Sequence, residues 1–165
     1  MSARLKLNPE ISYMLGIYAC NKGGQAIQLR TRSDAMAEKF AKIALDELGV
    51  LPSRILVEKD DNETRVFFYH SKLRKMLQKA LERREHLFKY SNTYSANYFA
   101  ALFDCVGGRD RKSLYLKGIE PVDYLILERL GVHCTQDGSK SRIASAKAFI
   151  GFIKDFSIRI RERAA

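Results

Sequence analysis

The segment FAALFDCVG at residues 99–107 and the segment MLGIYACN at residues 14–21 carry most of the information on how this chain folds. Both are almost entirely apolar, and each holds two small side chains one helical turn apart. The small residues are Gly16 and Cys20 in the earlier segment and Ala101 and Cys105 in the later one. Small side chains at this spacing allow two helices to approach closely. We therefore expect two buried helices that cross along these residues, with both thiols buried at the contact.

The sequence around these segments repeats in order. Each apolar helix is followed by an alternating strand, an amphipathic helix, two further strands and a last helix. The tripeptide Leu-Gly-Val closes the amphipathic helix of both units, at 48–50 and at 130–132. The elements expected in the first unit are helices at 11–20, 33–49 and 71–88 and strands at 26–32, 54–58 and 64–69. Those expected in the second unit are helices at 98–105, 121–131 and 148–156, a strand at 113–117 and two short strands around the turn at 136–139.

The two apolar segments resemble the LAGLIDADG motif of homing endonucleases and intron maturases, and the repeat extends the resemblance over nearly the whole chain. It implies an α+β fold of two pseudo-symmetric units, residues 1–90 and 91–165, in one compact body. In that family the two motif helices pack on a pseudo-twofold axis, and the strands form a saddle, backed by helices, that sits on duplex DNA. The resemblance therefore implies a monomer that binds nucleic acid, with duplex DNA as the first choice.

The resemblance fails at the catalytic positions. Family nucleases carry an acidic residue at the penultimate letter of each motif, and the two carboxylates hold a divalent metal for phosphodiester hydrolysis. Here those positions are Asn21 and Val106. One neutral amide oxygen is a poor ligand set for Mg²⁺, so we expect no catalytic residues, no metal or other cofactor, and no nuclease activity. The alternative is an active endonuclease that recruits other acids.

Two aspartates near the second motif are the acids that such an alternative would use. Asp104 lies about 200° around the helix from Val106, so its side chain should point elsewhere. Asp110 lies in the loop beyond the helix and is a weak substitute.

The expected nucleic-acid contacts lie on one face of the first strand of each unit. These residues are Gln28, Arg30 and Arg32 in the first unit and Tyr115 and Lys117 in the second. Arginine is a good bidentate donor to phosphate, and a glutamine side chain can reach an adenine. The runs 25–32 and 109–117 are each long enough for only one strand. We therefore expect a narrower saddle than in a homing endonuclease.

The composition supports a folded protein with a polyanionic partner. The 165 residues carry a net charge of +10 and are 46% hydrophobic, which excludes wholesale disorder. The apolar stretches are too short to span a membrane, and three widely spaced cysteines predict neither a disulfide framework nor a zinc site. We expect a soluble cytoplasmic protein.

Two further alternatives stay open at this point. Phe67, Tyr69 and Tyr115 on or near the sheet could stack on RNA bases, as in an RNA-processing factor. The chain could also be a protein-interaction subunit whose charge serves only solubility. The basic segment 72–89 is interpreted as a solvated helix face behind the sheet.

Overall fold

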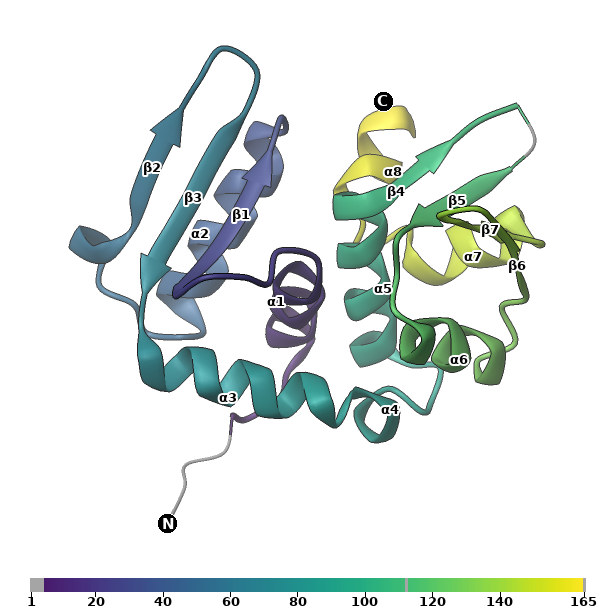
Figure 1. Ribbon diagram of the computed structural model, residues 1–165, viewed down its shortest axis with the longest axis horizontal. Coiled ribbons are helices and arrows are strands. Elements are labelled where there is room, and N and C mark those ends of the chain that lie inside the picture. The colour runs from purple at the N-terminus through teal and green to yellow at the C-terminus, as the bar shows by residue number, and fades with distance from the viewer. Residues whose placement is uncertain (1–4, 112, 165) are drawn as a thin grey trace.

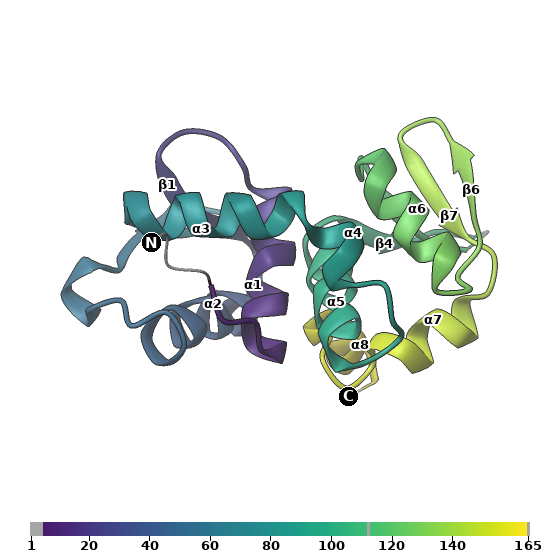
Figure 2. The same cartoon turned by 90° about the horizontal axis from the view of Figure 1, so that it is seen from below.

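Two apolar helices lie side by side at the centre of the computed structural model, which describes residues 5–111 and 113–164 (Figures 1 and 2). They are α1 (Pro9–Cys20) and α5 (Thr93–Val106). A Cβ atom added to Gly16 would lie 2.5 Å from the Cβ of Ala101 and 2.6 Å from the carbonyl oxygen of Tyr98. Only a hydrogen atom fits in that space, so the two helices approach each other closely at Gly16 and Ala101.

Both central helices begin at an asparagine that caps them. The Asn8 side chain accepts a hydrogen bond from the Ile11 amide, and Pro9 occupies the first helical position. Asn92 and Ser95 form a reciprocal capping box at the start of α5. The capping residues thus set where each helix begins. Most of the residues that follow are apolar, and nearly the whole surface of both helices is buried.

The first sheet is antiparallel, with strand order β1-β3-β2. Its strands are β1 (Ala26–Thr31), β2 (Leu56–Lys59) and β3 (Thr64–Tyr69). The helix α2 (Asp34–Asp46) covers the rear face, where the Phe40 ring packs on Phe68, and the short 3-10 helix η1 (Pro52–Arg54) precedes β2. A single strand therefore joins α1 to α2, as the sequence predicts.

The second sheet has four strands in the order β4-β5-β7-β6. They are β4 (Gly107–Arg109), β5 (Leu114–Lys117), β6 (Cys134–Asp137) and β7 (Lys140–Ile143). The helices of this half are α6 (Pro121–Arg129), α7 (Ala146–Ile153) and α8 (Ile158–Ala164). The strands β5, β7 and β6 pair as β1, β3 and β2 do, and β4 is an addition.

The extra strand β4 corrects the expectation of a single strand in the second half. Helix α5 passes directly into β4, because Gly107 and Gly108 are extended rather than turning the chain. A Cβ on Gly107 would collide with Phe103, and a Cβ on Gly108 would collide with the Tyr115 ring. These glycines therefore make room for aromatic rings, and the second half carries the hairpin that was expected to be missing.

The basic helix does not lie behind the sheet, contrary to the sequence interpretation. Its residues form α3 (Ser71–Glu82) and, after a break at Arg83, α4 (Arg84–Leu87). Leu73, Leu77 and Leu81 form its buried row. In Figure 1, α3 runs along the lower edge of the molecule beneath α1, whereas α2 backs the sheet.

A buried polar cluster joins the two halves. The Arg84 side chain is almost fully buried and lies 3.1 Å from a Glu120 carboxylate oxygen and 3.4 Å from Asp123. Asp123 also accepts a 2.6 Å hydrogen bond from the Tyr98 hydroxyl, and Lys22 pairs with Glu120 at 2.7 Å. Burial raises the pKa of Asp123.

Within residues 5–111 and 113–164, no helix has the length and apolar character needed to cross a membrane.

Candidate nucleic-acid interface

The outward face of β1 and the residue that directly follows this strand carry the predicted basic residues of the first half. Ile27 and Leu29 are buried against the core, whereas Arg30 and Arg32 are exposed. Within the described part of the chain, neither arginine makes a side-chain hydrogen bond or an ion pair. Both guanidinium groups are therefore available to a phosphate.

The neighbouring strand β3 adds cationic and aromatic side chains to the same face. The Arg65 guanidinium stacks on the Phe67 ring at 3.8 Å, and its Nε donates a 2.7 Å hydrogen bond to the Gln28 side-chain oxygen. Tyr69 meets Phe67 edge-on and is 54% exposed. Gln28 is therefore held by Arg65 through its side-chain oxygen, which leaves the amide nitrogen to donate to a base. We call Gln28, Arg30, Arg65, Phe67 and Tyr69 the first face.

The equivalent face of the second sheet contains Tyr115 and Lys117. The Lys140 ammonium lies over the Tyr115 ring at 4.3 Å, and Lys117 is exposed opposite Lys140 in the strand register. Arg142 is the register partner of Tyr115. We call Tyr115, Lys117, Lys140 and Arg142 the second face.

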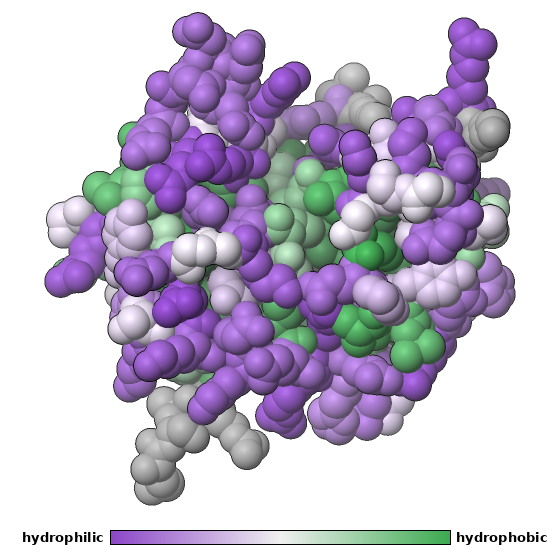
Figure 3. Space-filling model, in the orientation of Figure 1, coloured by the Kyte–Doolittle hydropathy of each residue, from purple (hydrophilic) through white to green (hydrophobic). Residues whose placement is uncertain are grey.

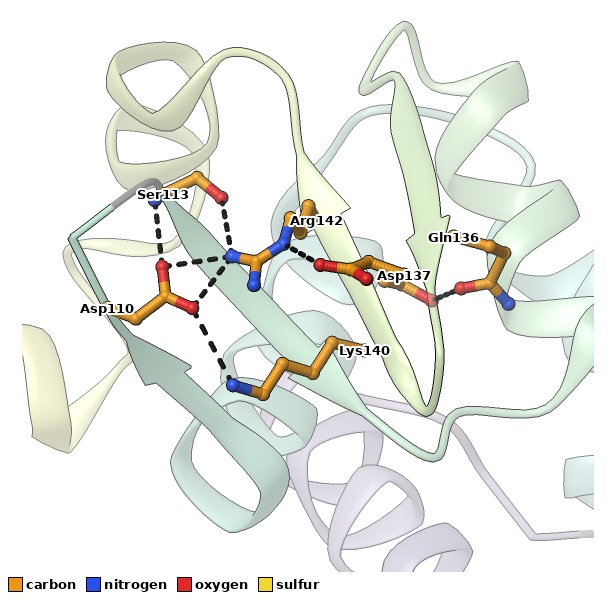
Figure 4. A network of polar contacts seen from close by, with 7 residues as sticks. Asp110, Ser113, Gln136, Asp137, Lys140 and Arg142 are labelled. Carbon is orange, nitrogen blue, oxygen red and sulfur yellow. Dashed lines mark hydrogen bonds and ion pairs between the residues drawn. The ribbon is translucent and has the colours of Figure 1, made fainter.

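Two aspartates partly neutralise the second face (Figure 4). One terminal nitrogen of Arg142 donates to both carboxylate oxygens of Asp110, at 2.8 and 2.9 Å, and the Arg142 Nε donates to Asp137 at 2.7 Å. Lys140 lies 3.6 Å from Asp110. Asp110 therefore fixes cations on this face and partly neutralises them, as Glu58 does for Arg65 on the first face at 3.5 Å.

A hollow of about 580 Å³ lies where the two halves meet. Arg30 and Arg32 line it from the first half, and Asp104, Cys105 and Arg159 line it from the second. Figure 3 shows hydrophobic residues exposed between two largely hydrophilic halves. The last turn of α5 thus lines a hollow that has arginines on both sides.

Comparison with known proteins was made by sequence and by structure. No family model matches the sequence, and no curated protein matches it. A mesophilic variant of the homing endonuclease I-DmoI superposes with a TM-score of 0.69 at 18% identity, over 89% of this chain and 96% of that chain. I-DmoI in complex with DNA and Mn gives the same TM-score and identity over 88% of this chain and 96% of that chain. The chain has the LAGLIDADG homing endonuclease fold.

A third structural match is full-length DUF199/WhiA from Thermatoga maritima. It gives a TM-score of 0.63 at 16% identity, over 93% of this chain and 57% of that chain. The α+β architecture predicted from the two apolar segments is therefore confirmed, with β4 as the addition.

The ends of the two LAGLIDADG helices carry a neutral set of side chains. Asn21 caps α1 by donating its side-chain amide to the Ile17 carbonyl at 2.8 Å, and Val106 is the last residue of α5. At the helix ends themselves, the groups that could ligate a metal are the Asn21 amide oxygen and the thiols of Cys20 and Cys105. Glu120 and Asp123 line a hollow with Cys20 and Val106, but both carboxylates are paired with Arg84. Mg²⁺ requires hard oxygen ligands, so these residues do not fit it. The described residues also contain no group of three or more His, Cys, Asp or Glu side chains suited to a metal.

Asp104 has a structural role. It is buried and accepts hydrogen bonds from the hydroxyls of Tyr13 and Ser157, both at 2.6 Å. It also accepts from the backbone amides of Ile158 and Arg159, at 2.9 and 3.0 Å. The carboxylate therefore caps α8 and points away from Val106, which agrees with its helical position.

The two cysteines meet at the last turn of the central helices. The Cys105 thiol hydrogen-bonds with Cys20, and this contact together with burial raises the pKa of Cys105. Both side chains are half-buried rather than fully buried, so that part of the expectation is wrong. The reason is their position: the helices end there, and no further turn covers the thiols.

The interface residues that the sequence interpretation missed are Arg65, Lys140 and Arg142. Lys140 and Arg142 alternate with buried residues in β7, which is the signal that revealed Arg30. The strand β3 lacks this alternation, because Val66, Phe67 and Phe68 are all buried, so Arg65 gave no such signal. The strands of all three residues were predicted, but the pairing with β1 and β5 that places them on the two faces came only from the structure.

Proposed function

We propose that this protein binds nucleic acid as a monomer, with duplex DNA as the preferred ligand, and that it does not cleave it. The observation that carries the proposal is the arrangement of the first face on a LAGLIDADG fold. Arg30 is exposed there beside Arg65 and Tyr69, and the exposed Arg32 directly follows β1. Solved structures with this fold include I-DmoI bound to its target DNA.

The chemistry of the two faces suits a phosphate backbone. Arginine donates two parallel hydrogen bonds to a phosphate, and each neutralised phosphate releases counterions. The slope of log affinity against log salt is therefore expected to change by about −0.9 for each phosphate contact on duplex DNA. We expect the variants Arg30→Ala, Arg32→Ala and Lys117→Ala to weaken binding and to flatten this slope.

A titration of labelled duplex DNA, single-stranded DNA and structured RNA at two salt concentrations tests the proposal. The matched control is Lys42→Ala, which removes an exposed cation from α2 behind the first sheet. Equal effects of Lys42→Ala and Arg30→Ala would show that the face is not the contact. Tighter binding of structured RNA than of duplex DNA would favour the second candidate, an RNA-binding factor, which the exposed Tyr69 ring supports as a stacking platform.

Loss of nuclease activity is the second part of the proposal. The helix ends lack the acids that would hold a metal, and the acids nearby are held by partners. Glu120 pairs with Lys22 and Arg84, and these cations lower its pKa. Supercoiled plasmid should therefore stay intact in Mg²⁺ or Mn²⁺. Site-specific cleavage that depends on Asp110 or Glu120 would contradict this part while leaving the binding proposal standing.

A further inference from the structure

A second hollow, of about 560 Å³, opens where β3 passes into α3, and Tyr69 is its one lining residue that also belongs to the first face. Its lining includes the cations Arg54, Arg74 and Lys75, together with His70, Ser71 and Tyr69. Among the described residues that line it, none is an aspartate or a glutamate. The hollow is therefore positively charged without local neutralisation, in contrast to the second face.

The turn from β3 into α3 builds this hollow. His70 caps the helix, because its Nδ1 accepts a 3.1 Å hydrogen bond from the Leu73 amide. In the neutral ring this leaves Nε2 as the nitrogen that carries the proton and can donate. The amides in the first turn of this twelve-residue helix point out of its N-terminal end, where they favour an anion.

Arg74 supplies a separate observation. Its Nε is buried and has no hydrogen-bond partner among the described residues. A buried donor without an acceptor costs free energy. Because that nitrogen is itself closed to solvent, a ligand in the hollow would meet the rest of the Arg74 side chain. Arg54 belongs to η1, which precedes β2, so the two arginines line the hollow from different elements.

Tyr69 connects this hollow to the first face. Its ring lies against Phe67 on the sheet and also lines the hollow. The side chains of Arg65, Phe67 and Tyr69, each in contact with the next, therefore lead along β3 from the sheet to the cations of α3. An extended polyanion lying on the first face would reach Arg54 and Arg74 next.

We propose that the hollow lined by Arg54, Tyr69, His70 and Arg74 binds backbone phosphates of nucleic acid held on the first face. This extends the interface from the sheet to the start of α3, and it rests on the proposed function. It also revises the interpretation of the basic helix: Arg74 and Lys75 belong to the interface, whereas Lys79 and Arg83 farther along are a solvated face.

The test compares two double variants that remove the same charge. Arg54→Ala/Arg74→Ala empties the hollow of guanidinium groups, and Lys79→Ala/Arg83→Ala removes two exposed cations farther along the same helical segment. The first variant should bind labelled duplex DNA about tenfold more weakly and flatten the salt slope by about 0.9 or more, whereas the control changes the slope by less than half of that. Circular dichroism and thermal unfolding establish that both variants are folded, and Arg74→Lys should retain part of the affinity.

The outcomes separate this proposal from the proposed function. If Arg30→Ala weakens binding while Arg54→Ala/Arg74→Ala behaves like the control, the hollow is not part of the interface although the protein binds nucleic acid. If the wild type binds none of the nucleic acids at either salt concentration, the proposed function fails and this inference fails with it.

A soluble phosphate compound is the competing occupant. Tripolyphosphate added to the free protein probes for it. A rise in unfolding temperature that requires Arg54 and Arg74, with unchanged DNA binding in the double variant, would assign the hollow to such a compound and overturn the proposal.

Discussion

The contact between α1 and α5 predicts a large effect from the smallest possible change, Gly16→Ala. In an open helix, alanine stabilises by about 1 kcal/mol relative to glycine. Here the new Cβ would lie 2.5 Å from the Cβ of Ala101 and 2.6 Å from the Tyr98 carbonyl oxygen. Overpacking of this kind costs about 1–3 kcal/mol. Because one of the close atoms belongs to the backbone, which moves less readily than a side chain, we expect a cost near the upper end of this range. The expected net loss in the free energy of unfolding is about 1–2 kcal/mol.

The matched control is Gly151→Ala in α7, where an added Cβ meets nothing within 4 Å. That change should stabilise the protein by up to about 1 kcal/mol. For a chain of this size each kcal/mol moves the unfolding temperature by about 2–4 °C, so the two variants should move in opposite directions in a thermal scan. Adding Ala101→Gly to Gly16→Ala should recover only part of the loss, because the Tyr98 carbonyl remains in place. A Gly16→Ala protein as stable as Gly151→Ala would refute the argument that the central helices touch at this point.

Three further changes probe buried polar groups. Asp104→Asn replaces one of two carboxylate oxygens that each accept two hydrogen bonds. Urea denaturation should show that the free energy of unfolding falls by about 2–4 kcal/mol. An unchanged free energy of unfolding would argue against the capping of α8 by Asp104. Arg84→Met leaves Asp123 buried without its cation and should cost about 3–5 kcal/mol, part of which Asp123→Asn restores in the same background. Burial lowers the pKa of Lys39 from its ordinary value of 10.5 to about 8. Between these two pH values the unfolded chain binds more protons than the folded protein, so rising pH favours folding. The stability of the wild type relative to Lys39→Met should therefore rise from pH 7 to pH 10, and a flat difference would contradict the burial of that ammonium.

Much of the core follows from short stretches of sequence. The spacing of Gly16 and Ala101 in apolar segments predicts the helix contact, because helical periodicity and side-chain size are local properties. The alternation around Leu29 and Arg30 likewise predicts which side of β1 is buried. The helical angle between Asp104 and Val106 is also local, which is why the aspartate could be placed away from the helix ends.

Features that depend on pairing between distant segments came only from the tertiary structure. The strand β4 was missed because Gly107 and Gly108 read as a helix end, and only the rings of Phe103 and Tyr115 packed against them explain the glycines. The pairing of Asp110 with Arg142 likewise joins residues 32 positions apart, and no local pattern specifies it.

The interface shows the same division. Sequence alone indicated basic strand faces and the loss of the acids at Asn21 and Val106, since residue type and strand period suffice for both. It placed the basic helix on the wrong side of the molecule, because the direction in which α3 leaves the sheet depends on its packing against α1. That packing brings Arg74 beside Tyr69 and Arg54, and a hollow made from three separate elements exists only once those elements have been assembled.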